Sequence, residues 1–243
     1  MRRLPVGLLV MSSLCFSSLA RGGEKKEDRS WKGSASMGGT LTDGNSDSVL
    51  VTGSLSWEWT EGVHGVTARL EGAYGETEEE TTSQRAKARA QYDRKWTERW
   101  YAFAASEAEH DGMADVEYRV KVAPGVGVKL LNTPVWQGRV ECGPAYVREE
   151  LDDGTRDDIV SIRFGQKLEC KLSETARAWE FLEYLPNLED WEETLLQGEL
   201  GVEAALVDPL SIRLVVQDTY DSEPASGRKE NDLKIVSALL VHF

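Results

Sequence analysis

Long apolar runs, basic residues and cysteine are all scarce in this sequence, and each shortage excludes a class of protein. Beyond the N-terminus there is no run of about 18 apolar residues, so no membrane-spanning helix is expected. The chain has 28 basic against 42 acidic residues, a formal net charge of −14. This excess of acid argues against nucleic acid as a partner, because phosphate binding needs a basic face.

Cysteine and histidine number only three each, which leaves little for metal or catalytic chemistry. No Cys/His spacing resembles a zinc site, so we expect neither a metal nor a cofactor. Cys142 and Cys170 could pair after export, but the expected hairpin register does not place them opposite one another, and both alternatives stay open. The pair His110-Asp111 could serve a hydrolase at one rim, but a loop histidine is more often merely solvated. We therefore expect no catalytic residue and no enzyme activity.

The N-terminal segment has the pattern of an export signal. Arg2 and Arg3 precede an apolar stretch at 8–19, and Ser18-Leu19-Ala20 places small residues before a cut. We interpret residues 1–20 as a signal peptide. Residues 21–29 contain no large apolar residue and are predicted to be a polar leader. The remaining domain, residues 30–243, would then lie outside the cytoplasm.

Apolar and polar residues alternate along most of this domain, which is typical of strands with two different faces. Over 116–130, for example, Val120 and Val122 share one face, and Arg119 and Lys121 share the other. Many such segments reach the 9–11 residues that a tilted strand needs to cross hydrocarbon. The pattern predicts twelve strands, at 31–41, 48–59, 64–75, 84–95, 99–108, 116–130, 135–148, 159–170, 175–185, 194–206, 210–218 and 232–243.

The connections between these segments are expected to alternate in length. Odd-numbered connections are polar and often long, and Asp43-Gly44-Asn45 and Asp153-Gly154 supply hairpin turn chemistry. Even-numbered connections are tight. Six tryptophans fall near the tight-turn ends of strands, where an indole ring suits a membrane interface: Trp31, Trp57, Trp59, Trp96, Trp100 and Trp136. This layout predicts an all-β fold, a closed antiparallel up-and-down transmembrane barrel with both termini on the periplasmic side.

Several short motifs resemble one family. They are Trp31-x-Gly33, the run 38–48 (GGTLTDGNSDS), the run 100–103 (WYAF), the run 124–127 (PGVG) and 141–146 (ECGPAY). Together they resemble the salt-induced outer-membrane protein family (domain of unknown function DUF481) of Gram-negative bacteria. The resemblance implies a barrel in the outer membrane, in contact with lipids and lipopolysaccharide, and no catalytic residue. Phe243 is similar to the C-terminal aromatic residue by which the barrel assembly machinery recognises its substrates.

A barrel in hydrocarbon must close, because an open sheet edge would leave backbone groups without hydrogen bonds. The polar face of each strand then points into the lumen. Basic residues exceed acidic ones on that face, which favours anions if a pore is open, whereas side chains that cross-link the interior would plug it. Twelve strands do not decide between these alternatives. The lumen-lining candidates are Arg69, Glu71, Arg85, Lys87, Arg89, Glu117, Arg119, Lys121, Arg139, Glu141, Arg163, Lys167, Glu199, Glu203, Arg213 and Lys234.

Acidic residues gather in the odd-numbered connections and their flanks, among them Glu109, Asp111 and the run 149–158. They could hold divalent cations at the rim or could be solvated loops. The run 152–158 lacks the ligand spacing of an EF-hand loop, so no metal ligand is assigned. Three functions remain: a non-enzymatic envelope role, with the salt-stress link resting on the family name alone; a narrow channel for small anionic solutes; and a hydrolase at the rim.

Overall fold

The computed structural model describes residues 29–42, 48–77, 80–112, 114–224 and 229–243. The predicted signal peptide, and all but Arg29 of the predicted polar leader, lie outside these residues, as does the predicted turn Asp43-Gly44-Asn45. Those assignments stay predictions. In the part of the chain that is described, no helix is long and apolar enough to cross a membrane.

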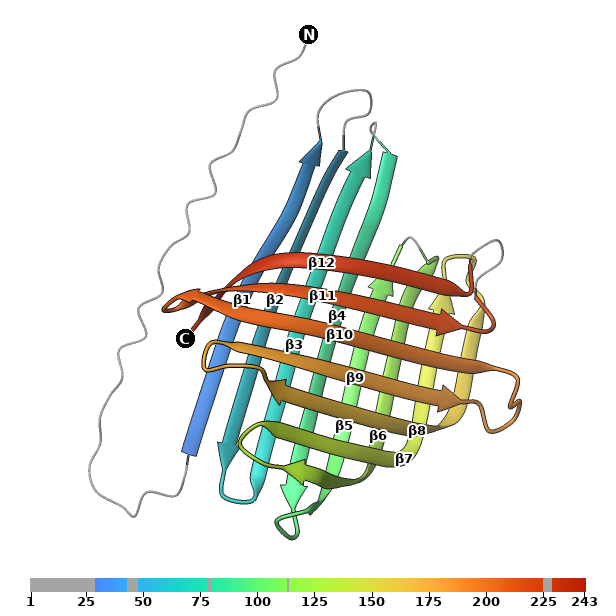
Figure 1. Cartoon of the computed structure of the whole chain (residues 1–243). Helices are drawn as coiled ribbons and strands as arrows, with labels where there is room; N and C mark the ends of the chain where they lie inside the picture. Colours follow the sequence, from blue (N-terminus) through green and yellow to red (C-terminus); the bar gives the residue numbers. More distant parts are fainter. Residues whose placement is uncertain (1–28, 43–47, 78–79, 113, 225–228) are drawn as a thin grey trace, which may run out of the picture.

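The described chain forms twelve antiparallel strands that close into one barrel (Figure 1). All twelve predicted segments are confirmed, with boundaries that differ by a few residues. The ring order is β1-β12-β11-β10-β9-β8-β7-β6-β5-β4-β3-β2, so every strand pairs with its sequence neighbours and β1 pairs with β12. The strands are β1 (Arg29–Thr42), β2 (Ser48–Glu61), β3 (His64–Thr77), β4 (Glu80–Lys95), β5 (Trp100–Asp111), β6 (Val116–Asn132), β7 (Trp136–Leu151), β8 (Arg156–Lys171), β9 (Ala176–Pro186), β10 (Thr194–Val207), β11 (Leu210–Asp221) and β12 (Asn231–His242).

The alternation in sequence becomes a difference between the outside and the inside of the barrel. Lys121 and Arg213 are 5% and 8% exposed, whereas their neighbours Val120 and Leu214 are 40% and 50% exposed. Successive side chains in a strand point to opposite faces, so apolar residues form the outer surface and charged residues fill the interior. The predicted assignment of the two faces is therefore confirmed on these strands.

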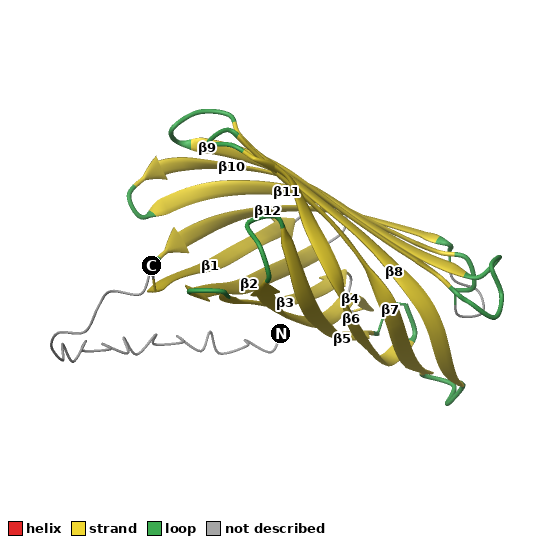
Figure 2. Ribbon diagram, turned by 90° about the horizontal axis from the view of Figure 1, so that it is seen from below, coloured by secondary structure: helices red, strands yellow, loops and turns green. Residues whose placement is uncertain are grey.

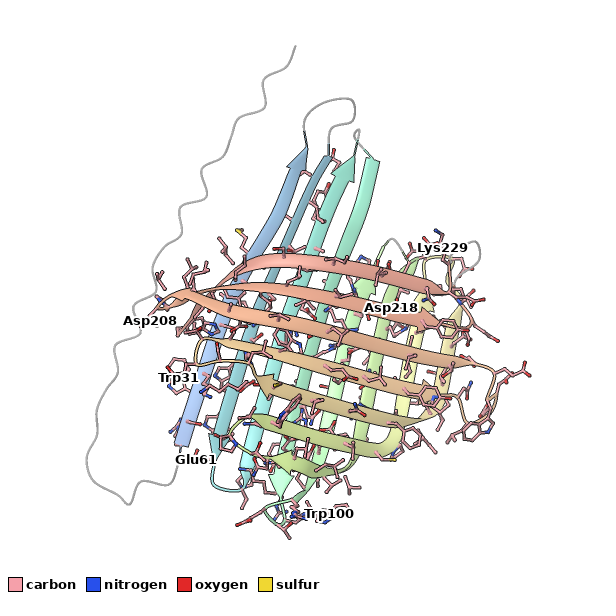
Figure 3. The ribbon with its side chains drawn as sticks, viewed as in Figure 1. Trp31, Glu61, Trp100, Asp208, Asp218 and Lys229 are labelled. Carbon is pink, nitrogen blue, oxygen red and sulfur yellow. The ribbon has the colours of Figure 1, made fainter. Side chains whose placement is uncertain are left out.

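The two ends of the barrel differ in their connections. We call the end with the start of β1, the end of β12 and the connections at 62–63, 96–99, 133–135, 172–175 and 208–209 the turn end, and the opposite end the loop end. Figure 3 shows Asp208, Trp31, Glu61 and Trp100 along the turn end and Lys229 at the far side. All six tryptophans of the predicted girdle lie at the turn end, and Trp31, Trp96 and Trp100 are at least half exposed.

The loop-end connections are shorter than the sequence predicts. A loop is predicted at 76–83, but β3 continues to Thr77 and β4 already begins at Glu80, so most of that segment is strand. The connection between β7 and β8 is only 152–155. The two longest connections there are 187–193 and 222–230. Much of the predicted acidic rim therefore lies within strands, where the pleat decides which acids face inward.

The barrel is flattened, and its interior is packed. Figure 1 shows β9–β12 running across the front of β1–β4, and Figure 2 shows the same crossing from below. A small apolar core of Ala123, Ala145, Val147 and Leu185 fills the interior near the loop end of β6, β7 and β9. Nearer the turn end the rings of Tyr101 and Phe103 are buried. They occupy the space where Cβ atoms would stand at Gly127 and Gly125, which explains these two glycines.

The seam between β1 and β12 is much shorter than the other strand pairings. Only four residue pairs register, from Ser34 opposite His242 to Met37 opposite Leu239, whereas β1 and β2 register along their whole lengths. The C-terminal Phe243 extends this seam at the turn end, where it exchanges two backbone hydrogen bonds of 2.9 and 3.0 Å with Gly33. Toward the loop end the two strands part.

The two cysteines of the domain are free thiols. Cys142 registers opposite Phe164 and Cys170 opposite Trp136. The structure therefore has no disulfide between Cys142 and Cys170, because the strand register does not place them opposite one another, as the sequence already indicates.

Candidate functional site

Ion pairs occupy the interior along its whole length. We consider the ion pairs of Lys or Arg with a carboxylate in which both side chains are less than half exposed. Among the described residues, these pairs join twelve basic to twelve acidic residues. The basic members are Arg69, Arg85, Lys87, Arg89, Arg119, Lys121, Arg139, Arg163, Lys167, Arg177, Arg213 and Lys234. The acidic members are Glu71, Asp93, Glu107, Glu109, Asp111, Glu141, Glu149, Glu169, Glu183, Glu199, Glu203 and Asp221. We call this set the interior network.

Glu107 on β5 lies at the centre of the interior network. Its carboxylate oxygens lie 2.6 Å from Nε of Arg89 and 3.0 Å from Nζ of Lys87. Lys121 on β6 approaches the same carboxylate at 3.6 Å and also donates to Glu183 on β9. One side chain of 7% exposure thus holds three cations from two strands.

The contacts continue across β7 and β8. Glu183 accepts a hydrogen bond from Arg163 on β8, which in turn donates to Glu141 on β7 at 2.8 Å. Glu141 also accepts from the phenol of Tyr101 at 2.8 Å and from Gln91 at 2.9 Å. Hydrogen-bonded networks of this kind are rigid when every member is satisfied, so the centre of the barrel is cross-linked from β4 to β9.

Other contacts cross the full width of the barrel. Around the ring of twelve, β4 and β10 are six positions apart, the largest separation that the ring allows. Arg89 on β4 nevertheless donates to the amide oxygen of Gln197 on β10 at 2.9 Å. Three further contacts join strands five positions apart: Arg69–Glu199 at 3.3 Å, Arg119–Asp221 at 2.9 Å and Lys234–Asp111 at 3.2 Å. Opposite walls of the barrel therefore touch.

Two cavities remain on the β9–β12 side. The first, of about 100 Å³, lies among β1–β4, β9 and β10–β12, and we call it the loop-end cavity. The second, of about 380 Å³, lies among the turns at 133–135 and 172–175 and the end of β12, and we call it the turn-end cavity.

A single layer of side chains separates the linings of the two cavities. Arg213 lines the loop-end cavity and Glu203 the turn-end cavity, and their charged groups are 2.7 Å apart. Arg177 contacts Glu203 at 3.2 Å. The guanidinium groups of Arg177 and Arg213 each lie 5.4 Å from the ring centre of Trp179, a cation–π distance. We call these four residues the Glu203 layer.

The predicted lumen residues are brought together, with one exception. Every basic candidate belongs to the interior network, as do Glu71, Glu141, Glu199 and Glu203. Glu117 is the exception, because the register shifts between Val116 and Tyr118. This shift turns Val116 inward and Glu117 outward, where its side chain is exposed.

The inward face carries more acidic residues than the sequence predicts. Sequence reasoning missed the acids of β5 and β9, which neutralise the inward cations: Glu107, Glu109 and Asp111 are 6–8% exposed and Glu183 is 3% exposed. Two of these acids, Glu109 and Asp111, were expected in an outer loop. Their spacing is the signal that could have found them, because the three β5 acids lie an even number of residues from Tyr101 and Phe103 and therefore on the same face of the strand. That inward face mixes aromatic with acidic residues, so β5 lacks the usual period-two separation of a polar from an apolar face.

The loop-end acids hold short-range contacts of their own. The side chain of Asp153 accepts a hydrogen bond of 2.8 Å from the backbone N–H of Thr155, which lowers the pKa of its carboxyl below the ordinary value. Glu150 and Arg156 pair at 2.8 Å on the exposed surface. Across the described ranges, no group of three or more metal-ligating side chains is positioned to hold an ion.

The histidines do not form a catalytic pair with the residues that the sequence suggests. His110 and Asp111 are successive residues of β5 and point to opposite faces; Asp111 is buried inside, and Nδ1 of His110 donates to the backbone carbonyl of Glu117 at 2.8 Å. Nε2 of His242 lies 3.1 Å from Glu203, and Nδ1 of His64 contacts the Tyr92 hydroxyl at 2.6 Å.

Comparison with known sequences identifies the family. The sequence profile described as "Protein of unknown function, DUF481" matches residues 35–243, most of the chain and nearly the whole barrel. The chain belongs to the DUF481 family. The resemblance drawn from the Trp, Gly and turn motifs is thus confirmed. Among curated proteins, no sequence gives a significant match.

Solved structures agree with the fold of this DUF481 barrel. The NanC porin superimposes with a TM-score of 0.54 at 9% identity, over 86% of this chain and 98% of the porin. The translocator domain of autotransporter NalP from Neisseria meningitidis gives 0.46 at 14% identity, covering 88% and 87%. The KdgM porin in complex with disordered oligogalacturonate gives 0.46 at 9% identity, covering 87% and 99%. The first of these likenesses shows the fold.

The family, the fold and the outer surface together give the location. Leu55, Leu70, Leu200 and Leu214 are each at least half exposed on the outside of the closed sheet. Such a surface is stable only in lipid, and a closed antiparallel barrel with short turns at one end is the architecture of outer-membrane proteins. The protein is an outer-membrane β-barrel of a Gram-negative bacterium.

Proposed function

We propose that this barrel is a non-enzymatic envelope protein that does not conduct at rest. The observation that carries the proposal is the set of contacts between opposite walls, above all Arg89–Gln197 between strands six positions apart. An open pore needs a continuous water path, and these side chains cross it. Because the interior network has as many carboxylates as cations, it carries no net charge that would oppose the closed arrangement.

The arrangement of possible catalytic groups supports a role without chemistry. Nucleophilic catalysis by a hydroxyl or thiol needs a base within hydrogen-bonding reach. Among the described residues, no Ser, Thr or Cys side chain hydrogen-bonds to a histidine. A phospholipid or peptide assay with His110→Ala as control tests this part, and turnover above the blank that the substitution removes would contradict it.

Conductance in planar bilayers tests the closed state directly. Refolded wild-type protein is expected to insert without producing discrete current steps. The control is proof of insertion: the same protein preparation is inserted into lipid vesicles, and the folded, heat-modifiable form is recovered from them. Regular steps from each inserted wild-type barrel would refute the proposal.

A second candidate is a narrow channel for small solutes, favoured by the two cavities that only the Glu203 layer separates. Truncating the ion pair of that layer with Glu203→Ala and Arg213→Ala together keeps the charge balance and is expected to join the cavities. If the protein is such a channel, the double variant conducts in clear steps. The matched control removes the exposed pair, Glu150→Ala with Arg156→Ala. A double variant at the Glu203 layer that folds and stays silent would exclude this candidate.

Taken as a whole, the interior network has equal numbers of cations and carboxylates, so its net charge gives the channel candidate no preference for anions. Interaction with lipids follows from the location. Recognition of Phe243 by the barrel assembly machinery and contact of the loop end with lipopolysaccharide stay predictions, and so does the link to salt stress.

A further inference from the structure

The seam between β1 and β12 leaves two strand edges that no described residue pairs. Beyond Met37 and Leu239 no residue pair registers between these strands, although β1 continues to Thr42 and β12 begins at Asn231. At Gly38 an added Cβ would collide with the Ser237 carbonyl, so the β12 backbone still covers this residue. An added Cβ at Gly39, in contrast, would have no β12 atom within 4 Å. The strands therefore part just beyond Gly38.

Unpaired edges are costly in a membrane. Each backbone N–H or C=O without a hydrogen bond costs several kcal/mol in hydrocarbon, and the described backbone hydrogen bonds include none that would cover 39–42 or 231–236 on the seam side. Figure 1 shows β12 crossing over β1 and running away from its upper half. The seam therefore needs a polar group to cover its edges on the inside and tolerates apolar groups outside.

The loop-end cavity lies directly behind this seam. Its lining includes Ser36 of β1 and Lys234, Val236 and Ala238 of β12, so residues from both sides of the seam border it. Just outside, Met37 and Ile235 are 70% and 64% exposed and belong to the apolar surface. A cavity with charged side chains in its lining and a lipid-facing surface thus meet at one gap in the sheet.

The accessible part of the cavity is cationic. Its lining carries six basic and three acidic side chains: Arg69, Arg85, Lys87, Arg89, Arg213 and Lys234 against Glu71, Glu199 and Asp218. The side chains of Arg69, Arg89 and Lys234 are 25–30% exposed, and each has a carboxylate partner that is only 6–8% exposed: Glu199, Glu107 and Asp111, respectively. Arg69 and Lys234 also pair with Glu71 and Asp232, whose side chains are 22% and 53% exposed. In addition, Nε of Arg69 is buried and has no hydrogen-bond partner among the described residues. An incoming anionic group can thus reach accessible cationic donors, one of which has an N–H to spare.

We propose that the β1–β12 seam binds a membrane amphiphile with an anionic headgroup, the headgroup in the loop-end cavity and the acyl chains outside between Met37 and Ile235. The headgroup oxygens accept hydrogen bonds from Arg69 and Lys234 and from the free edge of the seam. The acyl chains continue the lipid layer over the outer surface, so binding needs no opening of the barrel. This proposal goes beyond the closed-barrel function and does not depend on whether the protein conducts.

The test counts lipids bound to the full folded chain by native mass spectrometry in a mild detergent. The probes are dioleoyl phosphatidylglycerol, dioleoyl phosphatidylcholine with the same chains, and glycerol 3-phosphate without chains. Wild-type protein is expected to retain a single phosphatidylglycerol and neither of the other two. Lys234→Gln should weaken that retention about fivefold, as expected for the loss of one charged contact.

Lys167→Gln is the matched control. Lys167 is also an inward lysine, of 38% side-chain exposure against 30% for Lys234, and it pairs with a carboxylate two residues away, but it does not line the loop-end cavity. Its retention of phosphatidylglycerol should equal that of the wild type, with both variants shown to fold by heat modifiability. Equal losses in the two variants, or equal retention of phosphatidylcholine, would overturn the proposal.

A second measurement locates the lipid without any substitution. Phosphatidylglycerol with a photoactivatable acyl chain is expected to label peptides containing 36–39 and 233–239 above the rest of the barrel. Even labelling around the barrel would refute a site at the seam. Binding of glycerol 3-phosphate as tight as that of the lipid would mean a free-anion site instead, and dimers in the spectra that exclude lipid would mean that a second copy covers the edges. Conductance of the wild type bears on none of these results.

Discussion

Replacing Glu107 by Gln is the sharpest test of the interior network. The substitution keeps the size of the side chain but removes the charge that Lys87, Arg89 and Lys121 share. Lys87 keeps Glu109 at 2.9 Å and Lys121 keeps Glu183, whereas Arg89 keeps a hydrogen bond of 2.9 Å to the neutral amide of Gln197. The interior is left with one uncompensated positive charge in a buried position.

Breaking a buried pair by removing one partner costs about 3–5 kcal/mol, because the remaining charge stays desolvated. Since both lysines retain a second carboxylate, we expect a loss at the lower end, about 3 kcal/mol of the free energy of unfolding. The assay is urea unfolding of the barrel in lipid vesicles, followed by tryptophan fluorescence and by the heat-modifiable band. The midpoint should fall without a change in the slope.

Two further variants make this prediction refutable. Glu150→Gln removes the partner of Arg156, whose side chain is 62% exposed, and is expected to cost less than about 1 kcal/mol. Adding Lys87→Gln to Glu107→Gln restores the charge balance, so the double variant should be more stable than the two single losses predict. A loss for Glu107→Gln no larger than that for Glu150→Gln would show that the ion pairs do not hold the interior together.

Three other predictions concern packing, assembly and pH. Gly127→Val places a side chain where the Tyr101 ring lies and is expected to cost about 1–3 kcal/mol in the same urea assay. Deleting Phe243 removes two backbone hydrogen bonds at the turn end of the seam and should lower the yield of folded barrel in membranes. The lowered pKa of Asp153 stabilises the loop at pH values above the ordinary 3.8, and this contribution disappears as pH falls through the lowered value; the Thr155 amide shift in NMR should therefore titrate with a midpoint below 3.8.

Each of these predictions has a control. Gly53→Ala adds a Cβ whose nearest neighbour is an ordinary contact at 3.7 Å, so a loss equal to that of Gly127→Val would refute the packing argument. Phe243→Tyr keeps the backbone bonds and an aromatic ring, and normal yield after deletion of Phe243 would contradict its role. In Asp153→Asn the Thr155 shift should not titrate; a midpoint at or above the ordinary value in the wild type would contradict the hydrogen-bond explanation.

The sequence by itself determined the strands and their two faces. Period-two alternation is a local property, since side-chain direction in a strand depends only on parity, and it placed Lys121 inside and Val120 outside without any tertiary information. It failed locally at Glu117, because a register shift changes parity and leaves no mark in the pattern. It also failed on β5, where Tyr101 and Phe103 share the inward face with Glu107.

Only the tertiary structure decided which charges meet and whether the interior is filled. The contact between Arg89 and Gln197 joins residues far apart in sequence, and it depends on the flattening of the barrel and on the register accumulated around twelve strands. The short β1–β12 seam is likewise a property of closure, because the first and last strands meet only after every other register is set. A local sequence pattern carries no information about the register accumulated over all the strand pairs of the barrel. It therefore carries none about the cavity that lies behind the seam.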